Sequence, residues 1–260
     1  MPLTVREVYG WLDGIAPFAT AESFDNVGLL IGDLNATVDA LLFCVDITEA
    51  VVQEAVNRGA QLIVAHHPLM FGGVTSIDYG TPEGRVLCAL MAARLHVIVA
   101  HTNWDRAPGG VSDSLGEALG LQGLEAADEY IRVGMLKEPL GADALTEHAA
   151  KSLHAHVSRF GEAKEPLSRI AVGGGASGDR AAAAIAAGAQ ALLVGELKHH
   201  ELLFACGQGL VVLAAGHFAS ELVGMEALYR RFQNVAAKNL WQVQPLLYSK
   251  APFWGADLAH

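Results

Sequence analysis

The alternation of short apolar runs with helical stretches is the sequence feature that most constrains the fold. Apolar runs of strand length occur at Leu41–Val45, Gln61–Ala65 and His96–Ala100. Helical patterns follow these runs at residues 49–58, 84–94 and 111–119. A strand, a helix and a second strand in succession are typical of a parallel sheet with helices packed on its faces. The first half of the chain therefore predicts a mostly parallel α/β sheet.

The second half of the chain repeats this pattern. It predicts strands at residues 169–172, 191–194, 210–214 and 240–248, and helices at residues 179–187, 199–206 and 221–232. Between the halves, a strand is predicted at residues 131–136 and a helix at residues 145–153. We therefore predict an α/β fold of two linked, similar domains with mostly parallel sheets flanked by helices. The N-terminal domain covers residues 1–124, a connecting segment residues 125–165, and the C-terminal domain residues 166–260.

Local signals support several of these elements. Thr4 and Glu7 have the spacing of a capping box and predict a helix that continues to about Ile15. Gly59 and Gly188 each lie between a helical stretch and a predicted strand. Because glycine adopts the left-handed conformation without a steric penalty, we expect both glycines to end their helices in that conformation.

The two halves also share a pattern of histidines. In each half, two adjacent histidines come soon after a predicted strand. His66 and His67 follow their strand directly, and His199 and His200 lie a few residues beyond theirs. One strand later, a histidine precedes a carboxylate by four positions: His101 with Asp105, and His217 with Glu221. An ancient duplication explains this pattern. The alternative is coincidence, because a helix, a Gly-Ala pair and a strand often follow one another in α/β proteins.

Composition and charge exclude several classes of protein. The apolar residues make up 52% of the 260 residues, which is too many for a disordered chain. No uninterrupted apolar run reaches the roughly 20 residues of a membrane span. The net charge of −11 argues against a nucleic-acid polymer or an anionic membrane as a partner. We find no secretion signal and expect Cys44, Cys88 and Cys206 to be buried free thiols in the reducing cytoplasm.

His66 and His67 follow a predicted strand, and Pro68 prevents the ladder of hydrogen bonds from continuing. The carboxyl ends of strands in α/β sheets are where ligands usually bind. Adjacent residues of a regular strand point to opposite faces, so both imidazoles reach one site only if the backbone bends or if the site holds two metals. The alternative interpretation is a solvated or hydrogen-bonded pair in a loop.

Asp105 follows the next predicted strand, and its loop reaches the same edge of the sheet if the two strands are parallel. Its carboxylate is a hard oxygen ligand that divalent metals bind together with nitrogen ligands. The alternative role for Asp105 is to cap a turn before Pro108. His101 has three possible roles, because it could bind a metal, orient Asp105 or carry a proton.

His217 and Glu221 lie four residues apart, on one face of the first turn of a predicted helix, where they can bind one cation. We expect Ser220 to cap this helix. Five ligands are too many for one tetrahedral site, but they suit two metals about 3.5–4 Å apart that share a carboxylate and a water. The predicted ligands of this dinuclear site are His66, His67, Asp105, His217 and Glu221.

Other polar segments are less informative. The glycine-rich segment at residues 173–178 could bind a phosphate through its amides, but it lacks the lysine of a P-loop, and we favour a tight turn. Lys198 could meet a substrate anion. Asp25, Asn26 and Asp46 are either partners of site residues or simple turn residues. No Gly-x-Ser-x-Gly motif supports a serine nucleophile.

Five motifs in order resemble those of the GTP cyclohydrolase I type 2 homologues, which are the Nif-three-like dinuclear metal-binding proteins. The motifs are Ser23-Phe24-Asp25-Asn26-Val27-Gly28-Leu29, Ala65-His66-His67-Pro68-Leu69, His101-Thr102-Asn103-Trp104-Asp105 with Gly109-Gly110, Gly195-Glu196-Leu197-Lys198-His199-His200, and Gly216-His217-Phe218-Ala219-Ser220-Glu221. Phe24 stands where the family often has tryptophan. The resemblance implies two linked α/β domains, a dinuclear metal site between them, and a ring-shaped homohexamer built as a trimer of dimers. Its metal ligands carry over to His66, His67, Asp105, His217 and Glu221.

The resemblance implies a metal-dependent hydrolase that acts on a nucleotide or a related heterocycle. In that mechanism His101 or Lys198 moves a proton or holds an anionic group of a small substrate, and both residues are candidate catalytic residues. Histidine and carboxylate sites accept Zn, Fe, Mn or Ni, so the sequence does not identify the two divalent ions. The alternative function is a non-catalytic metal carrier or a regulatory interaction protein with a structural metal centre.

Overall fold

The computed structural model describes residues 2–72 and 74–252. These residues form two compact units. Unit 1 runs to Pro108 and resumes at Met225–Pro252, and unit 2 comprises Gly109–Gly224. The long helix α9 (His217–Asn239) contributes its first turns to unit 2 and the remainder to unit 1.

A five-stranded sheet forms the centre of unit 1, with strand order β13-β4-β5-β6-β2. The first four of these strands are parallel to their neighbours, and β2 runs antiparallel to β6. A second, two-stranded sheet pairs β1 with β3. The strands are β1 (Leu3–Thr4), β2 (Gly28–Ile31), β3 (Thr37–Val38), β4 (Ala40–Cys44), β5 (Leu62–Ala65), β6 (His96–Val99) and β13 (Gln244–Leu247). The predicted parallel arrangement of β4, β5 and β6 is confirmed.

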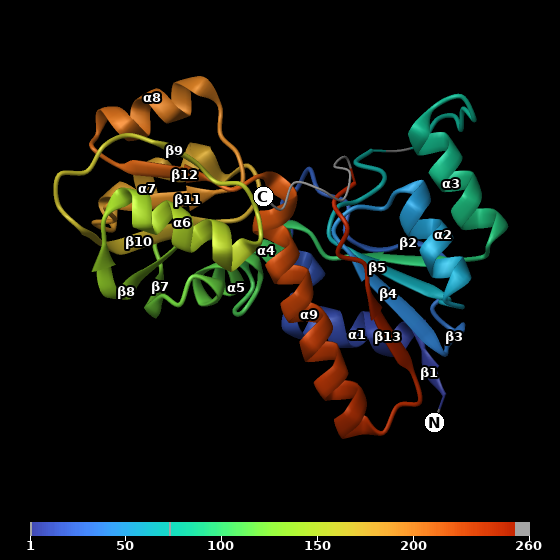
Figure 1. Ribbon diagram of the computed structural model, residues 1–260. Coiled ribbons are helices and arrows are strands. Elements are labelled where there is room, and N and C mark those ends of the chain that lie inside the picture. Colours follow the sequence, from blue (N-terminus) through green and yellow to red (C-terminus); the bar gives the residue numbers. More distant parts are fainter. Residues whose placement is uncertain (1, 73, 253–260) are drawn as a thin grey trace. The chain divides into compact units, whose positions relative to one another are not determined.

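Helices cover both faces of this sheet (Figure 1). On one face, α2 and α3 pack into a core that contains Leu42, Ile63 and Val97. On the other face, Phe232 of α9 lies against Phe43 and Trp11, with ring centroids 5.6 and 5.2 Å apart. The helices of unit 1 are α1 (Val5–Ile15), η1 (Phe18–Thr20), α2 (Glu49–Asn57), α3 (Pro82–Ala92), α4 (Thr102–Arg106) and the second part of α9.

The sheet of unit 2 is mixed. Its strand order is β7-β8-β10-β11-β12-β9, and only β10, β11 and β12 are parallel to one another. The outer strands β7, β8 and β9 pair in the antiparallel direction. The strands are β7 (Gln122–Ala126), β8 (Arg132–Leu140), β9 (Ser158–Phe160), β10 (Leu167–Gly173), β11 (Ala191–Val194) and β12 (Val211–Ala214).

Two cores flank this mixed sheet. One contains residues of α5 and α6, such as Leu115 and Leu145, and the other contains alanines of α7 and α8, such as Ala184 and Ala205. The helices of unit 2 are α5 (Val111–Ala118), α6 (Ala142–Leu153), η2 (Ser177–Arg180), α7 (Ala181–Ala186), α8 (His199–Gly207) and the start of α9.

The observed units differ from the predicted domain boundaries at residues 124 and 165. The segment that we expected to connect the domains contributes β8, α6 and β9 to unit 2, because its strands pair with β10 and β12. The end of the chain returns to unit 1, where β13 pairs with β4. Residues 253–260 of the predicted second domain lie outside the described residues.

Two local predictions are confirmed. The capping box of α1 is present, with the Glu7 amide donating to Thr4 Oγ1 and the Thr4 amide donating to Glu7 Oε2. Gly59 and Gly188 have positive φ angles of 67° and 75° and follow α2 and α7. The prediction of buried thiols is confirmed for Cys44 and wrong for Cys88 and Cys206, which are partly exposed on helices α3 and α8.

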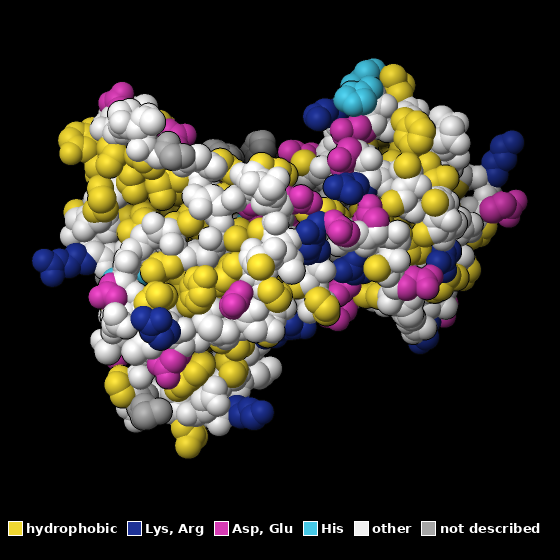
Figure 2. Space-filling model, turned by 180° about the vertical axis from the view of Figure 1, so that it is seen from behind, with side chains coloured by type: hydrophobic (Ala, Val, Ile, Leu, Met, Phe, Trp, Pro, Cys, Tyr) yellow, Lys and Arg dark blue, Asp and Glu magenta, His cyan; other side chains and the backbone are white. Residues whose placement is uncertain are grey.

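Side chains of both charges lie on the surface. On the face shown in Figure 2, the Lys and Arg side chains are interspersed with Asp and Glu side chains. None of the helices in the described part of the chain combines the length and the apolar character needed to cross a lipid bilayer.

Candidate metal centre

Three histidines of unit 1 gather at the carboxyl ends of β5 and β6. His66 and His67 follow the last residue of β5, where the chain bends, and their ring centroids lie 5.0 Å apart. The ring of His101, which precedes α4, lies 5.1 Å from His66 and 5.4 Å from His67. One ring nitrogen from each of the three lies within 4.8 Å of the others. The bend at the end of β5 thus lets both adjacent histidines face one place.

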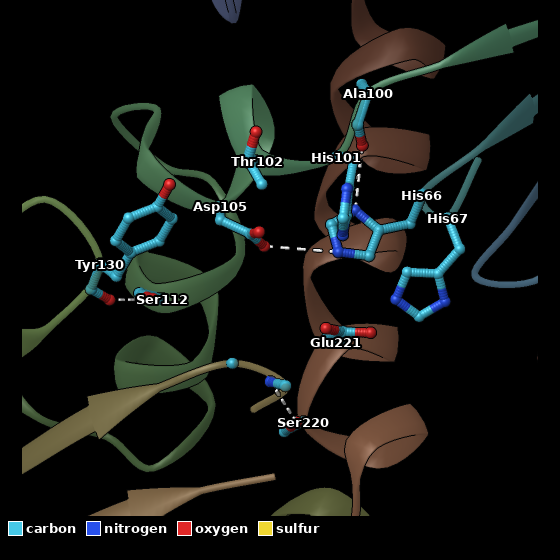
Figure 3. A network of polar contacts seen from close by, with 12 residues as sticks. His66, His67, Ala100, His101, Thr102, Asp105, Ser112, Tyr130, Ser220 and Glu221 are labelled. Carbon is cyan, nitrogen blue, oxygen red and sulfur yellow. Dashed lines mark hydrogen bonds and ion pairs between the residues drawn. The ribbon is translucent and has the colours of Figure 1, made fainter. Parts of the chain in front are cut away.

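His66 has a defined tautomer. Its Nδ1 lies 2.9 Å from the carbonyl oxygen of Ala100, and because a carbonyl only accepts, Nδ1 carries the proton (Figure 3). On the other side of the ring, Nε2 lies 3.3 Å from Asp105 Oδ1. The Asp105 oxygen is buried and accepts no hydrogen bond from the described residues. Two electron-rich atoms at this distance are stabilised by a cation, either a proton or a metal ion, so the pair fits a metal site.

Carboxylates orient the other two imidazoles of unit 1. His67 Nδ1 donates to Asp46 Oδ1 at 2.8 Å, and His101 Nδ1 donates to Asp25 Oδ1 at 2.9 Å. In metal sites, a ligating histidine usually donates its second ring N–H to such an acceptor. All three imidazoles of the cluster therefore carry their proton on Nδ1 and leave Nε2 available to bind a metal ion. Asp25 and Asp46 were predicted to be either partners of site residues or simple turn residues. The structure supports the first interpretation, because each carboxylate accepts a hydrogen bond from a histidine of the cluster.

Asp25 is held in its ionised form. Burial raises the pKa of this carboxyl group, but hydrogen bonds from His101 and Thr102 outweigh burial and hold the pKa well below its usual range. The Thr102 amide and hydroxyl both donate to Oδ2, at 3.1 and 2.5 Å. A permanently charged Asp25 fixes the proton of His101 on Nδ1.

Replacing Asp46 with alanine tests this arrangement. Loss of the carboxylate removes the acceptor that fixes the His67 proton on Nδ1. We expect Asp46→Ala to weaken metal binding about tenfold. This is the lower end of the loss usually caused by removing a group that hydrogen-bonds to a metal ligand. Competition with a chromophoric chelator measures the affinity. The control is Asp39→Ala, at an exposed position of the same unit, which should bind metal like the wild type. Equal affinity in the two variants would contradict the prediction.

A histidine and a glutamate form a second pair of candidate ligands, which lies in unit 2 on the first turn of α9. His217 Nε2 lies 3.0 Å from Glu221 Oε1, and Nδ1 lies 3.0 Å from Glu196 Oε1. The hydrogen bond to Glu221 outweighs the opposing effect of burial and, together with Glu196, raises the pKa of His217 to about 9. At neutral pH this imidazole is protonated when no metal is bound. A metal ion at Nε2 takes the place of that proton.

The glycine-rich segment after β10 supports Glu221. Gly175 has a φ of +56°, and a Cβ at this position would lie 2.3 Å from Glu221 Oε1. The Gly175 amide donates to Ser220 Oγ at 3.0 Å, and this hydroxyl donates to the carbonyl of His217 at 2.8 Å. The expected cap at Ser220 is wrong, because α9 begins at His217 and Ser220 lies inside its first turn. The segment is a turn that packs behind the carboxylate, as favoured from the sequence.

The other polar residues of unit 2 have different surroundings. Lys198 precedes α8 with an exposed side chain, and its Nζ lies 3.7 Å from Glu201 Oε1. His199 and His200 are exposed on the same helix. Within the described part of the chain, none of these three belongs to a candidate metal-binding group. Glu196 was not predicted as a partner of His217, although it lies two residues after the end of β11, at the carboxyl edge of the sheet.

Comparison with known proteins assigns the family. The model of the family described as Duf34/NIF3 (NGG1p interacting factor 3) matches residues 3–252. The chain belongs to the Duf34/NIF3 family. This assignment confirms the resemblance in the five sequence motifs.

Two curated members of the Duf34/NIF3 family are similar over most of their length. Both are named "GTP cyclohydrolase 1 type 2 homolog". The protein from Streptomyces coelicolor is 34% identical, with 92% of this chain and 89% of the relative covered. The protein from Clostridium perfringens is 32% identical, with 84% of this chain and 87% of the relative covered.

Solved structures share the fold. A hypothetical protein from Staphylococcus aureus superposes with a TM-score of 0.90 and 26% identity, covering 98% of this chain and all of that one. A Bacillus cereus protein described as related to NIF3 superposes with a TM-score of 0.93 over the same share of this chain and all of its own. Its 21% identity supports the fold alone. The α/β fold is thus that of known NIF3 proteins.

Proposed function

We propose that this protein binds two divalent metal ions and uses them to hydrolyse a nucleotide or a related heterocycle. The observation that carries the proposal is the pair formed by buried His66 Nε2 and Asp105 Oδ1, which suits a cation. The proposed ligands are His66, His67 and Asp105 of unit 1 together with His217 and Glu221 of unit 2. Five ligands of this kind are the number that we expect for two ions.

Hydrogen-bond acceptors in the chain fix the protons of two histidine ligands on Nδ1. Ala100 and Asp46 keep protons on Nδ1 of His66 and His67, so Nε2 of each ring can bind a metal ion. Asp105 and Glu221 supply negative charge, which lowers the cost of holding two cations close together. Bound divalent ions of this kind lower the pKa of a water ligand and polarise a substrate oxygen.

We propose His101 as the group that moves a proton. Its Nδ1 proton is fixed by ionised Asp25, so Nε2 can accept a proton and later return it. The same geometry suits His101 to metal binding, and the metal content of His101→Ala distinguishes the two roles. A variant that keeps both ions but loses turnover supports proton transfer. For Lys198, which is exposed and next to Glu201, we propose only contact with an anionic group of the substrate.

The names of the relatives suggest where to begin the search for a substrate. Both curated proteins are called GTP cyclohydrolase 1 type 2 homologs. Purine nucleotides are therefore the first compounds to test. We also propose, from the sequence resemblance, that the protein forms a homo-oligomer, with a hexamer as the state to look for by light scattering.

Elemental analysis of the purified protein, followed by an activity screen after metal reconstitution, tests the proposal. We expect two equivalents of divalent metal per chain, and nucleotide hydrolysis that a chelator abolishes and added metal restores. Metal binding without turnover of any nucleotide or related heterocycle would support the alternative of a non-catalytic metal carrier. A wild-type protein that binds no divalent ion after reconstitution would contradict the proposal altogether.

A further inference from the structure

The segment between β5 and α3 carries several exposed apolar side chains in unit 1. They include Phe71, Val74, Ile77 and Tyr79. Single exposed apolar side chains are common on protein surfaces and need no explanation. Phe71 differs because its ring lies against His101 of the histidine cluster, with centroids 5.9 Å apart and an interplanar angle of 74°. Its side chain nevertheless remains 56% exposed.

The backbone just before Phe71 is anchored at Leu69 and at Met70. Leu69 packs against the core of unit 1. Asn26 Nδ2 donates a hydrogen bond of 2.6 Å to the carbonyl oxygen of Met70. The neighbouring Asp25 holds Nδ1 of His101. Two consecutive side chains thus hold the His101 imidazole and the backbone next to Phe71, and the phenyl ring lies edge-to-face with that imidazole.

An exposed aromatic ring beside the histidine cluster favours a particular kind of ligand. Planar heteroaromatic rings stack on phenyl rings in offset or edge-to-face arrangements, and gain more than the burial of apolar area alone provides. Stacking of a nucleobase on an aromatic side chain strengthens binding by roughly tenfold or more. Ribose and phosphate groups gain nothing comparable from a phenyl ring. The arrangement beside the histidine cluster therefore suits a ligand with a planar base.

We propose that Phe71 is a specificity-determining residue that stacks on the planar heteroaromatic ring of the substrate. This inference rests on the proposed function, because it places the ring of the substrate beside the metal-binding histidines. The phenyl ring selects a ligand with a base over one that offers only sugar and phosphate. It makes no contribution to metal binding itself.

Binding of two probes to the metal-loaded protein tests the inference. Guanosine monophosphate has a purine ring, and ribose 5-phosphate lacks one. Isothermal titration calorimetry should show that Phe71→Leu binds guanosine monophosphate about tenfold more weakly than the wild type, because a leucine side chain cannot stack. The affinity for ribose 5-phosphate should not change. Phe71→Tyr keeps the aromatic ring and should bind guanosine monophosphate like the wild type.

Phe204→Leu is the matched control, since Phe204 is a similarly exposed phenylalanine, on α8 of unit 2. It should bind both probes like the wild type. The inference is overturned if Phe71→Leu retains wild-type affinity for guanosine monophosphate, or if it loses affinity for both probes equally. It is also overturned if the metal-loaded wild type does not prefer guanosine monophosphate to ribose 5-phosphate.

The metal content of each variant, measured by elemental analysis, separates this inference from the proposed function. We expect Phe71→Leu to retain as much metal as the wild type. If it loses metal, Phe71 acts by supporting the histidine cluster, and the inference is wrong while metal binding by the wild type stands. If the wild type itself binds no metal, the proposed function fails and the inference fails with it.

Discussion

Replacing His66 with alanine should remove at least one of the two expected metal ions and abolish metal-dependent turnover. The imidazole is fully buried and its Nε2 lies 3.3 Å from Asp105 Oδ1, so its removal takes a nitrogen ligand out of the buried position beside this carboxylate. Elemental analysis of the reconstituted variant measures the loss. Thermal unfolding gives an independent readout, because an ion that binds only the folded state raises its stability. Added metal should raise the melting temperature of the wild type much more than that of the variant.

The controls for His66→Ala address folding. Losing the imidazole leaves the Ala100 carbonyl without its donor, which costs about 1–3 kcal/mol. His66→Asn is a second variant with a smaller change in volume and a side-chain amide that can donate. His96→Ala removes a histidine of the same unit outside the metal-binding groups, one that accepts a hydrogen bond from the Asp33 amide. Wild-type metal content in a folded His66→Ala protein would show that His66 is not a ligand.

Replacing Gly175 with alanine should weaken metal binding about 100-fold without altering any proposed ligand. The new Cβ would lie 2.3 Å from Glu221 Oε1, which is too close, and the carboxylate would have to move. Glu221 is only 3% exposed, so it has little room for adjustment. Changes that act indirectly on a metal site reduce the affinity for the metal about 10–100-fold. We expect the displaced carboxylate to cause a loss at the upper end of this range. Chelator competition and calorimetry measure the affinity.

Gly188→Ala is the matched control for this variant. Gly188 also has a positive φ, of +75°, so alanine pays the same kind of backbone cost. Its nearest neighbour is Arg169 Nε, 3.9 Å from the new Cβ, which is an ordinary contact. Both variants should lose about 1–2 kcal/mol of stability, but only Gly175→Ala should lose metal affinity. Equal metal affinity in the two variants would show that the glycine does not shape the position of Glu221.

Much of unit 1 could be predicted from the sequence because its signals are local. Short apolar runs bounded by glycine and polar residues predicted β4, β5 and β6, and the capping box located the start of α1. The parallel order of these strands follows from the helices between them. Once three parallel strands are predicted, their carboxyl ends share an edge. The gathering of His66, His67 and His101 was therefore predictable in outline.

The organisation of unit 2 was less predictable because strand pairing depends on contacts between distant residues. Nothing in the composition of residues 125–165 distinguishes a connecting segment from the edge of a sheet, and only pairing with β10 and β12 decides the matter. The return of β13 to unit 1 is a similar case, since its partner β4 lies about two hundred positions earlier in the chain. Helix α9 starts earlier than predicted, and this places Ser220 inside the helix rather than at its cap.

The residue types and their order along the chain are enough to predict the α/β class, the family and the candidate ligands, because strand ends and metal-binding side chains leave short-range patterns. The tautomers and the supports of those ligands depend on tertiary structure. Hydrogen bonds from His101 to Asp25 and from His67 to Asp46 join residues 76 and 21 positions apart. Gly175 packs against the carboxylate of Glu221, which lies 46 positions later in the chain. Only folding brings such groups within a few ångströms, and at that distance they determine which nitrogen of each histidine can bind a metal.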